Sequence, residues 1–455
     1  MNPESSDQDI NNTAVEGSIL PTFLKYLIPS LIGILAMSTA AIIDAIFIGK
    51  YVGDSALAAV NLIMPFMALL FGVGLTLSVG GSVRAGKYIG ENNYKAASAI
   101  FSKTLVVMTL VSIVICGLGY LLHELLFKGF GANDEVAPLM AQYLLPLLPF
   151  LVAQMITIVL YFFIRVDGRP NLAAIALALG SVINIVLDYV FIVQFQWGLK
   201  GAALATGLAQ LIPMLILLSY FFDKNRQLVF SFKQDHWFEV FNALYNGLSE
   251  FVSEISAGVI AFILNWLLIT SVGVHGVAAI AVINYILMIG FMMFFSLGDA
   301  CQVIISQNFG AKKPKRIGQF LKLAFVFSIV VSVLCILPML LFPKTLISMF
   351  LQDQAHTTID LAMGYIQIIW AVFVFAGLNM IISAYLTAVH LPAQSALVAV
   401  FRTLIMPSML LLIFYFWIPS IHFLWALPLA ELVTFIVAMI IFIKFKPSSV
   451  VVALV

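Results

Sequence analysis

The sequence predicts an all-α integral membrane protein: twelve transmembrane helices in two parallel-repeat six-helix bundles around a central cavity. Three observations predict this class. Hydrophobic residues make up 63% of the 455 residues and charged residues only 9%, too little polar surface to cover a water-exposed globule. The chain also contains twelve long apolar runs, and its second half repeats its first.

Each apolar run holds about 20 residues or more, the length that a helix needs to cross a hydrocarbon core of about 30 Å. Polar or glycine-containing turns separate the runs. We therefore expect membrane spans at 26–48, 56–79, 100–122, 137–163, 171–193, 201–222, 248–270, 276–298, 318–341, 361–386, 393–416 and 423–443.

The internal repeat becomes visible when the chain is compared with itself at a shift of 220 residues, which grows to 222 farther along. The coinciding residues are Val52-Gly53 with Val272-Gly273, Ala58-Ala59 with Ala278-Ala279, Gly90 with Gly310, Lys95 with Lys315, Tyr143 with Tyr365, and Pro170 with Pro392. Each half contains six spans, and an even number of crossings gives both halves the same orientation. We therefore expect parallel repeats with a cavity between them.

Polar segments define the predicted domain organisation. We expect a disordered amino-terminal tail at 1–20, an N-lobe at 21–222, a cytoplasmic linker at 223–246, a C-lobe at 247–446 and a carboxy-terminal tail at 447–455. No removable signal peptide is expected. Most Lys and Arg residues fall on the side of the spans that also holds both termini. The positive-inside rule therefore predicts a multi-pass protein of the plasma membrane, the bacterial inner membrane, with both termini in the cytoplasm.

Several function classes are disfavoured. A formal net charge of +1 gives no indication of nucleic-acid binding, and the chain has no G-x-x-x-x-G-K-[ST] motif for ATP. The six His residues form no H-E-x-x-H pair, and Cys116, Cys301 and Cys335 lie far apart within predicted spans. We therefore expect no enzyme, no resident cofactor or metal and no disulfide. We also expect the chain to act as a monomer in membrane lipid.

Polar residues in four spans of the first half predict an ion site. Asp44, Tyr143, Asp188 and Thr206 are all expected roughly 8–11 Å below the outer boundary, and Asn184 shares a helical face with Asp188. A carboxylate at the centre of a span costs about 2.5–3.5 kcal/mol, so two of them require compensation. A proton or a hard cation such as Na⁺, bound by the oxygens of Asp44, Asn184, Asp188 and Thr206, would supply it. The alternative is that each residue only hydrogen-bonds across a helix interface, or that Asp44 lies at a helix end exposed to water.

The second half does not repeat these polar residues. Leu264, Met406 and Leu410 stand where the first half has Asp44, Asn184 and Asp188. Its own membrane charges are Glu250 and Glu254, one helical turn apart, with Arg402 and Glu431. The two glutamates and Arg402 are candidate contacts for a cationic substrate. The glutamates could equally pair with Arg402 or face a water-filled vestibule.

Pro29 lies fifteen residues before Asp44 in the same predicted span. Proline removes a backbone hydrogen bond from a helix, so it predicts a bend that the ion site could bias. A static kink is the alternative.

Together these features resemble the multidrug and toxic compound extrusion (MATE) transporters, over essentially the whole chain after the amino-terminal tail. The resemblance rests on Asp44-Ala-Ile-Phe-Ile-Gly49, on Val52-Gly53 and Ala58-Ala59, on Asn184 with Asp188, and on Gly298-Asp-Ala-Cys-Gln302 followed by Ser306-Gln-Asn-Phe-Gly-Ala311. The run Gly247-Leu-Ser-Glu-Phe251 is similar to that of MepA-like members, in the branch whose coupling site lies in the amino-terminal lobe.

The resemblance implies a secondary antiporter that exports amphipathic or cationic drugs in exchange for H⁺ or Na⁺, without ATP. It implies that Asp44, Asn184, Asp188 and Thr206 line the coupling-ion site, with Pro29 at the bend of helix one. The alternative is a flippase for a lipid or a lipid-linked oligosaccharide. A flippase would be expected to line its cavity with several basic residues, and only Arg402 is clearly available.

Overall fold

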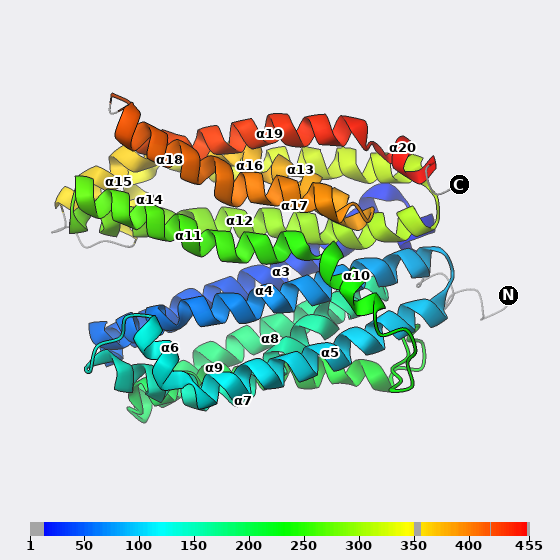
Figure 1. Cartoon of the computed structure of the whole chain (residues 1–455), viewed down its shortest axis with the longest axis horizontal. Coiled ribbons are helices and arrows are strands. Elements are labelled where there is room, and N and C mark those ends of the chain that lie inside the picture. Colours follow the sequence, from blue (N-terminus) through cyan, green and yellow to red (C-terminus); the bar gives the residue numbers. More distant parts are fainter. Residues whose placement is uncertain (1–12, 350–355, 419, 453–455) are drawn as a thin grey trace. The chain divides into compact units, whose positions relative to one another are not determined.

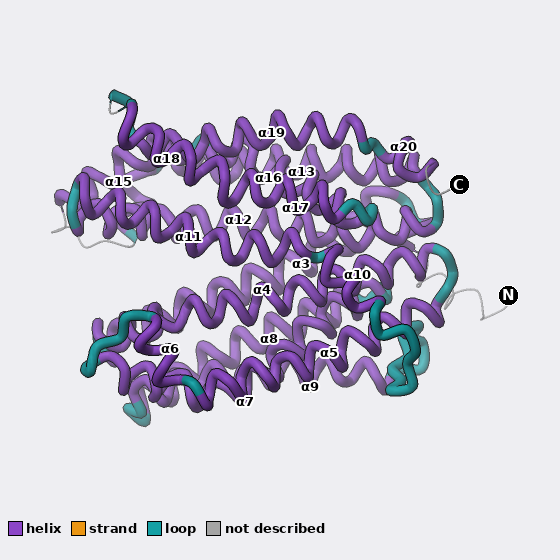
Figure 2. The backbone as a smooth tube through the Cα atoms, viewed as in Figure 1, coloured by secondary structure: helices purple, strands orange, loops and turns teal. Residues whose placement is uncertain are grey.

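The computed structural model describes residues 13–349, 356–418 and 420–452, and every regular element in these ranges is a helix (Figures 1 and 2). The described chain divides into two compact units, the first ending at Gly247 and the second beginning at Leu248. Eleven of the described helices are long and apolar enough to cross a membrane. The number is twelve if one bent pair of helices counts as a single span, and these helices confirm the predicted all-α membrane class.

The first unit contains the six predicted spans of the N-lobe and the linker. Its elements are α2 (Thr13–Glu16), α3 (Ile19–Phe47), the π-helix η1 (Ile48–Val52), α4 (Asp54–Gly90), α5 (Tyr94–Leu121), α6 (His123–Gly129), α7 (Val136–Val166), α8 (Pro170–Asp188), the π-helix η2 (Tyr189–Gln194), α9 (Gly198–Leu218), the 3₁₀ helix η3 (Ser219–Phe222) and α10 (Glu239–Asn246).

The second unit contains the other six spans. Its elements are α11 (Leu248–Ser271), α12 (Val274–Gly310), α13 (Pro314–Leu341), α14 (Pro343–Ser348), α15 (His356–Ile369), α16 (Val372–Ala388), α17 (Pro392–Val400), the π-helix η4 (Phe401–Ile405), α18 (Met406–Trp417), the 3₁₀ helix η5 (Phe423–Trp425), α19 (Ala426–Lys444) and α20 (Pro447–Val452). The tenth span is the bent pair α15 and α16, whose axes differ by 52°.

The repeat seen in the sequence is also present in the backbone. Helices α4 and α12 each have 37 residues, α5 and α13 each have 28, and both pairs begin 220 residues apart. The turns repeat too, because Gly53 and Gly273 both have positive φ, at 115° and 80°. A residue with a side chain rarely adopts such a conformation, so glycine is retained where the second span of each half begins.

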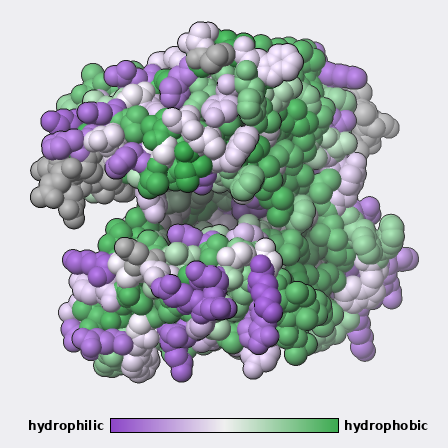
Figure 3. Space-filling model, turned by 60° about the vertical axis from the view of Figure 1, so that its left-hand side comes forward, coloured by the Kyte–Doolittle hydropathy of each residue, from purple (hydrophilic) through white to green (hydrophobic). Residues whose placement is uncertain are grey.

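Packing in the first unit is centred on α7, which contacts α4, α5, α8 and α9. Most of its second half is buried, from Ala153 to Val166. The outward sides of the helices remain apolar, with Leu110 58% and Val186 54% exposed. Wide apolar areas are visible on the surface in Figure 3, as expected of helices that face hydrocarbon rather than water.

The two predicted tails contain more structure than the sequence indicated. Residues 1–12 lie outside the described residues, but α2 begins at Thr13 and the side chain of Ala14 is fully buried. At the other end, α20 packs on α13 and buries Val451, which is 4% exposed. The prediction of a disordered segment is therefore wrong for residues 13–20, and the carboxy-terminal segment is helical through Val452. Both segments carry apolar side chains that gain from burial.

Candidate functional site

Four packed helices of the first unit carry the residues predicted to form the ion site. Asp44 lies near the end of α3, Asp188 is the last residue of α8, Tyr143 is on α7 and Thr206 is on α9. Helix α3 packs against α8, α8 against α9, and α9 against α7. The structure therefore brings together residues that are up to 162 positions apart in the sequence.

The carboxyl groups of Asp44 and Asp188 face each other. They lie close enough to share a hydrogen bond when one of them carries a proton. Asp188 is fully buried and Asn184, one turn earlier on α8, is 9% exposed. Tyr143 is buried beside Thr206 and lies within the electrostatic influence of both carboxylates. All five predicted residues thus belong to one polar cluster, which we call the carboxylate cluster.

Most polar atoms of the carboxylate cluster are buried without a hydrogen-bond partner from the described protein. These atoms are Asp44 Oδ1, both Oδ atoms of Asp188, Asn184 Nδ2 and Thr206 Oγ1. A buried polar atom without a partner is costly, typically by about 1–3 kcal/mol. Since the amide of Asn184 can present oxygen or nitrogen in the same place, the cluster offers up to five oxygens to one ligand. Such a set suits a proton or an oxygen-coordinated cation.

Among the described residues, no group of three or more His, Cys, Asp and Glu residues is placed to hold a metal ion. The carboxylate cluster contains only two acids. Any cation there would also need the amide and hydroxyl oxygens, as an alkali ion accepts more readily than a transition metal.

Backbone irregularities lie beside the carboxylate cluster. The π-helix η1 begins four residues after Asp44, and η2 begins directly after Asp188. Short π-helical segments within α-helices are rare and frequent at functional sites. At the positions of the second unit that correspond to η2, 411–416, helix α18 is regular. The two halves therefore differ in backbone as well as in polar residues.

In the second unit, Arg402 forms an ion pair with Glu431. Its Nε lies 3.0 Å from Glu431 Oε1, and the central carbon of its guanidinium group, Cζ, lies over the ring of Phe291, 5.4 Å from the ring centroid. The amide of Asn379 donates to Glu431 Oε2 at 2.7 Å. Pairing of Arg402 with Glu250 or Glu254 was the alternative open in the sequence. The structure instead pairs it with Glu431, because η4 packs directly against α19.

A cavity of about 60 Å³ lies inside the second unit. Its polar lining comprises Ser249, Glu250, Ser253, Asp299, Gln302, Ser383 and Arg402. Gln302 Nε2 donates to Glu250 Oε1 at 3.3 Å. Glu254, predicted beside Glu250 as a substrate contact, is not part of this lining. Of the three predicted substrate contacts, the structure thus brings Glu250 and Arg402 to one cavity.

Sequence reasoning missed Asp299 and Gln302 as functional candidates. They lie three residues apart, on one face of α12, within an apolar helix, and both point to the same cavity. Two polar residues three positions apart within an apolar helix are a signal that could have identified them from the sequence. The role of Glu431 as partner of Arg402 carried no sequence signal, because 29 residues separate the two.

Comparison with known proteins adds three findings. A family model described as MatE matches residues 29–190 and 251–413. The multidrug export protein MepA of Staphylococcus saprophyticus is 22% identical over 94% of both chains, and an FAD transporter of Shewanella oneidensis is 24% identical over 84% of this chain and 85% of its own. A crystal structure of MATE in complex with MaL6 superposes with a TM-score of 0.91 at 22% identity, covering 97% of this chain and 99% of the other.

Proposed function

This chain belongs to the MATE family, whose members are transporters rather than enzymes, and from that premise we propose an ion-driven drug exporter. In the proposed cycle, amphipathic or cationic compounds leave the cell in exchange for H⁺ or Na⁺ that enters it. The carboxylate cluster carries the proposal: two facing carboxyl groups, buried with unpartnered polar atoms, change their charge when an ion arrives.

The energy available from one entering charge is sufficient for export. At roughly 100 mV an inward elementary charge yields about 2.3 kcal/mol, which sustains a gradient of about fiftyfold at 1.4 kcal/mol per decade. Coupling requires that ion and substrate have different affinities for the outward-open and inward-open states. We place ion binding at Asp44 and Asp188 in the outward-open state, where it follows drug release.

In this cycle, Pro29 is the point at which α3 would bend during the change between states. It is buried within α3, and the helix runs through it without a break in the state described. Since Pro29 removes one backbone hydrogen bond from α3, bending there costs less than elsewhere in the helix. Protonation or ion binding at Asp44, on the same helix, would then bias the bend.

We assign substrate contact to the cavity of the second unit, through Glu250 and Arg402, with Glu254 nearby. Glu250 supplies negative charge for a cationic group, and Gln302 already orients one of its oxygens. Among the described residues that line this cavity, Arg402 is the only cation, and Glu431 neutralises it. An acidic lining suits cations better than the pyrophosphate of a lipid-linked sugar, so the cavity favours the exporter over the flippase.

Dye efflux from proteoliposomes tests the proposal. The parent chain, Asp44→Asn and Asp188→Asn are compared under an imposed pH gradient and, separately, an imposed sodium gradient. Asp134→Asn is the matched control, because Asp134 is exposed in a turn outside the spans. The panel includes a cationic dye and FAD, since the relatives include a drug exporter and an FAD transporter.

We expect gradient-driven efflux from the parent and from Asp134→Asn, and its loss from both cluster variants. The gradient that drives the parent identifies the ion. Driven efflux that survives both cluster substitutions would remove the coupling site. No efflux under either gradient, together with transfer of a lipid between leaflets, would favour the flippase.

A further inference from the structure

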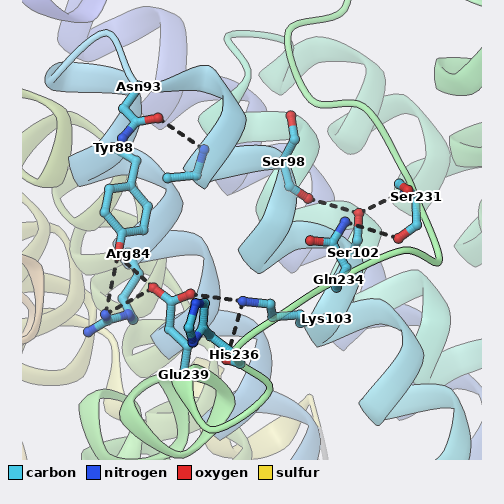
Figure 4. Close-up of polar contacts among 11 residues, drawn as sticks. Arg84, Tyr88, Asn93, Ser98, Ser102, Lys103, Ser231, Gln234, His236 and Glu239 are labelled. Carbon is cyan, nitrogen blue, oxygen red and sulfur yellow. Dashed lines mark hydrogen bonds and ion pairs between the residues drawn. The ribbon is translucent and has the colours of Figure 1, made fainter.

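The short helix α10, at the end of the linker, is fixed to the first unit by one carboxylate. Glu239 Oε1 accepts from the hydroxyl of Tyr88 at 2.6 Å and from Arg84 at 3.3 Å, and Oε2 accepts from Lys103 at 3.1 Å (Figure 4). Burial opposes ionisation of Glu239, but the hydrogen bonds from Tyr88, Lys103 and Arg84 outweigh it and lower the pKa of Glu239. The carboxylate therefore stays charged and holds α10 to α4 and α5.

Close backbone contacts fix the level of α10 along α4. A Cβ atom added at Gly80 would overlap the carbonyl group of Ala243, and one added at Gly247 would overlap that of Thr76. The inner face of α10 is buried, through Val240, Ala243 and Asn246. Helix α10 thus crosses α4 where the apolar run ends at Val79 and the basic residues begin at Arg84. This level is the expected boundary between hydrocarbon and headgroups.

The opposite face of α10 exposes three aromatic side chains. Phe238 is 74%, Phe241 61% and Tyr245 53% exposed, and their spacing of three and four residues puts them on one side of the helix. The rings of Phe238 and Phe241 lie 5.2 Å apart. We call Phe238, Phe241 and Tyr245 the aromatic face of α10. Trp237, beside it, is 41% exposed.

We propose that the aromatic face of α10 lies in the headgroup region of the membrane leaflet on the Lys/Arg-rich side, so that α10 is an interfacial anchor. The occupant is phospholipid rather than a protein partner because α10 packs on the membrane-spanning helices α4 and α5 at the level where the apolar run of α4 ends, and because the span α11 begins directly after Gly247 in the chain. Trp, Tyr and Phe are also the residues that favour this interface.

This anchor gives the linker a defined position. Glu239 connects it to the inner ends of α4 and α5, while the aromatic face connects it to lipid. Any movement of these two helices relative to the bilayer would then be resisted or transmitted through α10. The proposal does not depend on which compound the protein transports.

Nitroxide labels on single cysteines test the proposal in the full chain, reconstituted into phospholipid vesicles after Cys116, Cys301 and Cys335 are changed to Ser. Labels at Phe238→Cys, Phe241→Cys and Tyr245→Cys are compared for collision with oxygen, which partitions into lipid, and with a water-soluble nickel chelate. Leu110→Cys, on the exposed side of the span α5, is the lipid reference. Lys233→Cys, in the exposed linker loop, is the aqueous reference.

We expect the oxygen-to-nickel ratio at the aromatic face to be several-fold above that at Lys233 and below the value at Leu110, as for a position between water and hydrocarbon. As an independent readout with native residues at the face, brominated lipid should quench Trp237, seen as the difference between the parent and Trp237→Phe. Nickel access equal to that at Lys233 would overturn the proposal. Exclusion of both reagents would also overturn it, because protein then covers the face. Spin broadening that disappears on dilution with unlabelled chain would identify a second copy as that cover.

Discussion

Arg402 and Glu431 show how a membrane protein retains a full charge without exposing it. Their side chains are 14% and 9% exposed, and Asn379 adds a hydrogen bond to the carboxylate. Removing two charges from water costs several kcal/mol for each ion, which good pairing geometry offsets. If either side chain loses its charge, the other charge stays buried without a partner and the protein is destabilised.

We predict that Glu431→Gln lowers stability by about 3–5 kcal/mol, because it leaves the Arg402 cation buried without a counter-ion. The double variant Arg402→Met/Glu431→Met should recover most of this loss. The loss and its recovery are measured as melting temperatures in detergent. A thiol-reactive dye follows unfolding, because it reacts with buried Cys116 and Cys301 when they become exposed. Equal melting temperatures for the parent and Glu431→Gln would show that the pair is not the stabilising contact.

Asp167 is a buried acid in the turn between α7 and α8, outside the spans. Burial raises its pKa to about 6, although hydrogen bonds from the Tyr220 hydroxyl and the Gln227 N–H, with Arg169 nearby, partly offset that effect. Its ordinary value is 3.8. Asp167 therefore contributes stability that is complete below about pH 4 and is lost as the pH rises through about 6, by about 3 kcal/mol.

Asp167→Asn should remove this pH dependence, because an amide does not ionise and its oxygen still accepts from Tyr220. The melting temperature of the variant, measured relative to the parent, should rise between about pH 4 and about pH 7. Parallel curves for the two proteins across this range would contradict the assigned pKa.

At the scale of elements, the position of α10 depends on glycine. Gly80 lies on the buried face of α4, where α10 approaches the backbone too closely for any side chain. Gly117, on α5, has open space around its Cα and lies on an exposed face, so it is a matched control.

We predict that Gly80→Ala destabilises the first unit by about 1–3 kcal/mol, the usual cost of overpacking, because α10 must move away from α4 and the contacts of Glu239 with α4 and α5 must shift. Gly117→Ala should be neutral or stabilise by up to about 1 kcal/mol through helix propensity. Hydrogen exchange of the α10 backbone amides distinguishes the two variants, because it should become faster in Gly80→Ala and stay unchanged in Gly117→Ala. Unchanged exchange in Gly80→Ala would show that α10 tolerates displacement.

At the scale of the whole molecule, the distribution of Lys and Arg predicts orientation. With the twelve spans that the sequence predicts, both termini fall on the side rich in Lys and Arg, and the positive-inside rule predicts that this side is the cytoplasm.

A green fluorescent protein fused after Val455 should therefore fluoresce, and alkaline phosphatase at the same place should be inactive. The matched control is truncation after Lys50 at the end of the first span, where the two reporters should give the opposite result. Phosphatase activity from the full-length fusion would reverse the proposed orientation.

Hydropathy alone was enough to predict the spans and the fold class, because lipid leaves the backbone no alternative to helices that satisfy their own hydrogen bonds. The repeat was equally readable, since both halves keep the glycines and prolines of their turns. Asp44 and Asp188 could be predicted as a pair from their equal depth, because polar residues are rare in such spans.

Only the tertiary structure determines which charged side chains pair and which helices contact each other. Arg402 could face Glu250, Glu254 or Glu431, and only the packing of η4 against α19 selects Glu431. The 52° bend between α15 and α16, the π-helices beside Asp44 and Asp188, and the docking of α10 likewise arise from contacts between segments distant in sequence. Periodicity reports which side of a helix is apolar, but it carries no record of which neighbouring helix will supply the partner for a charge.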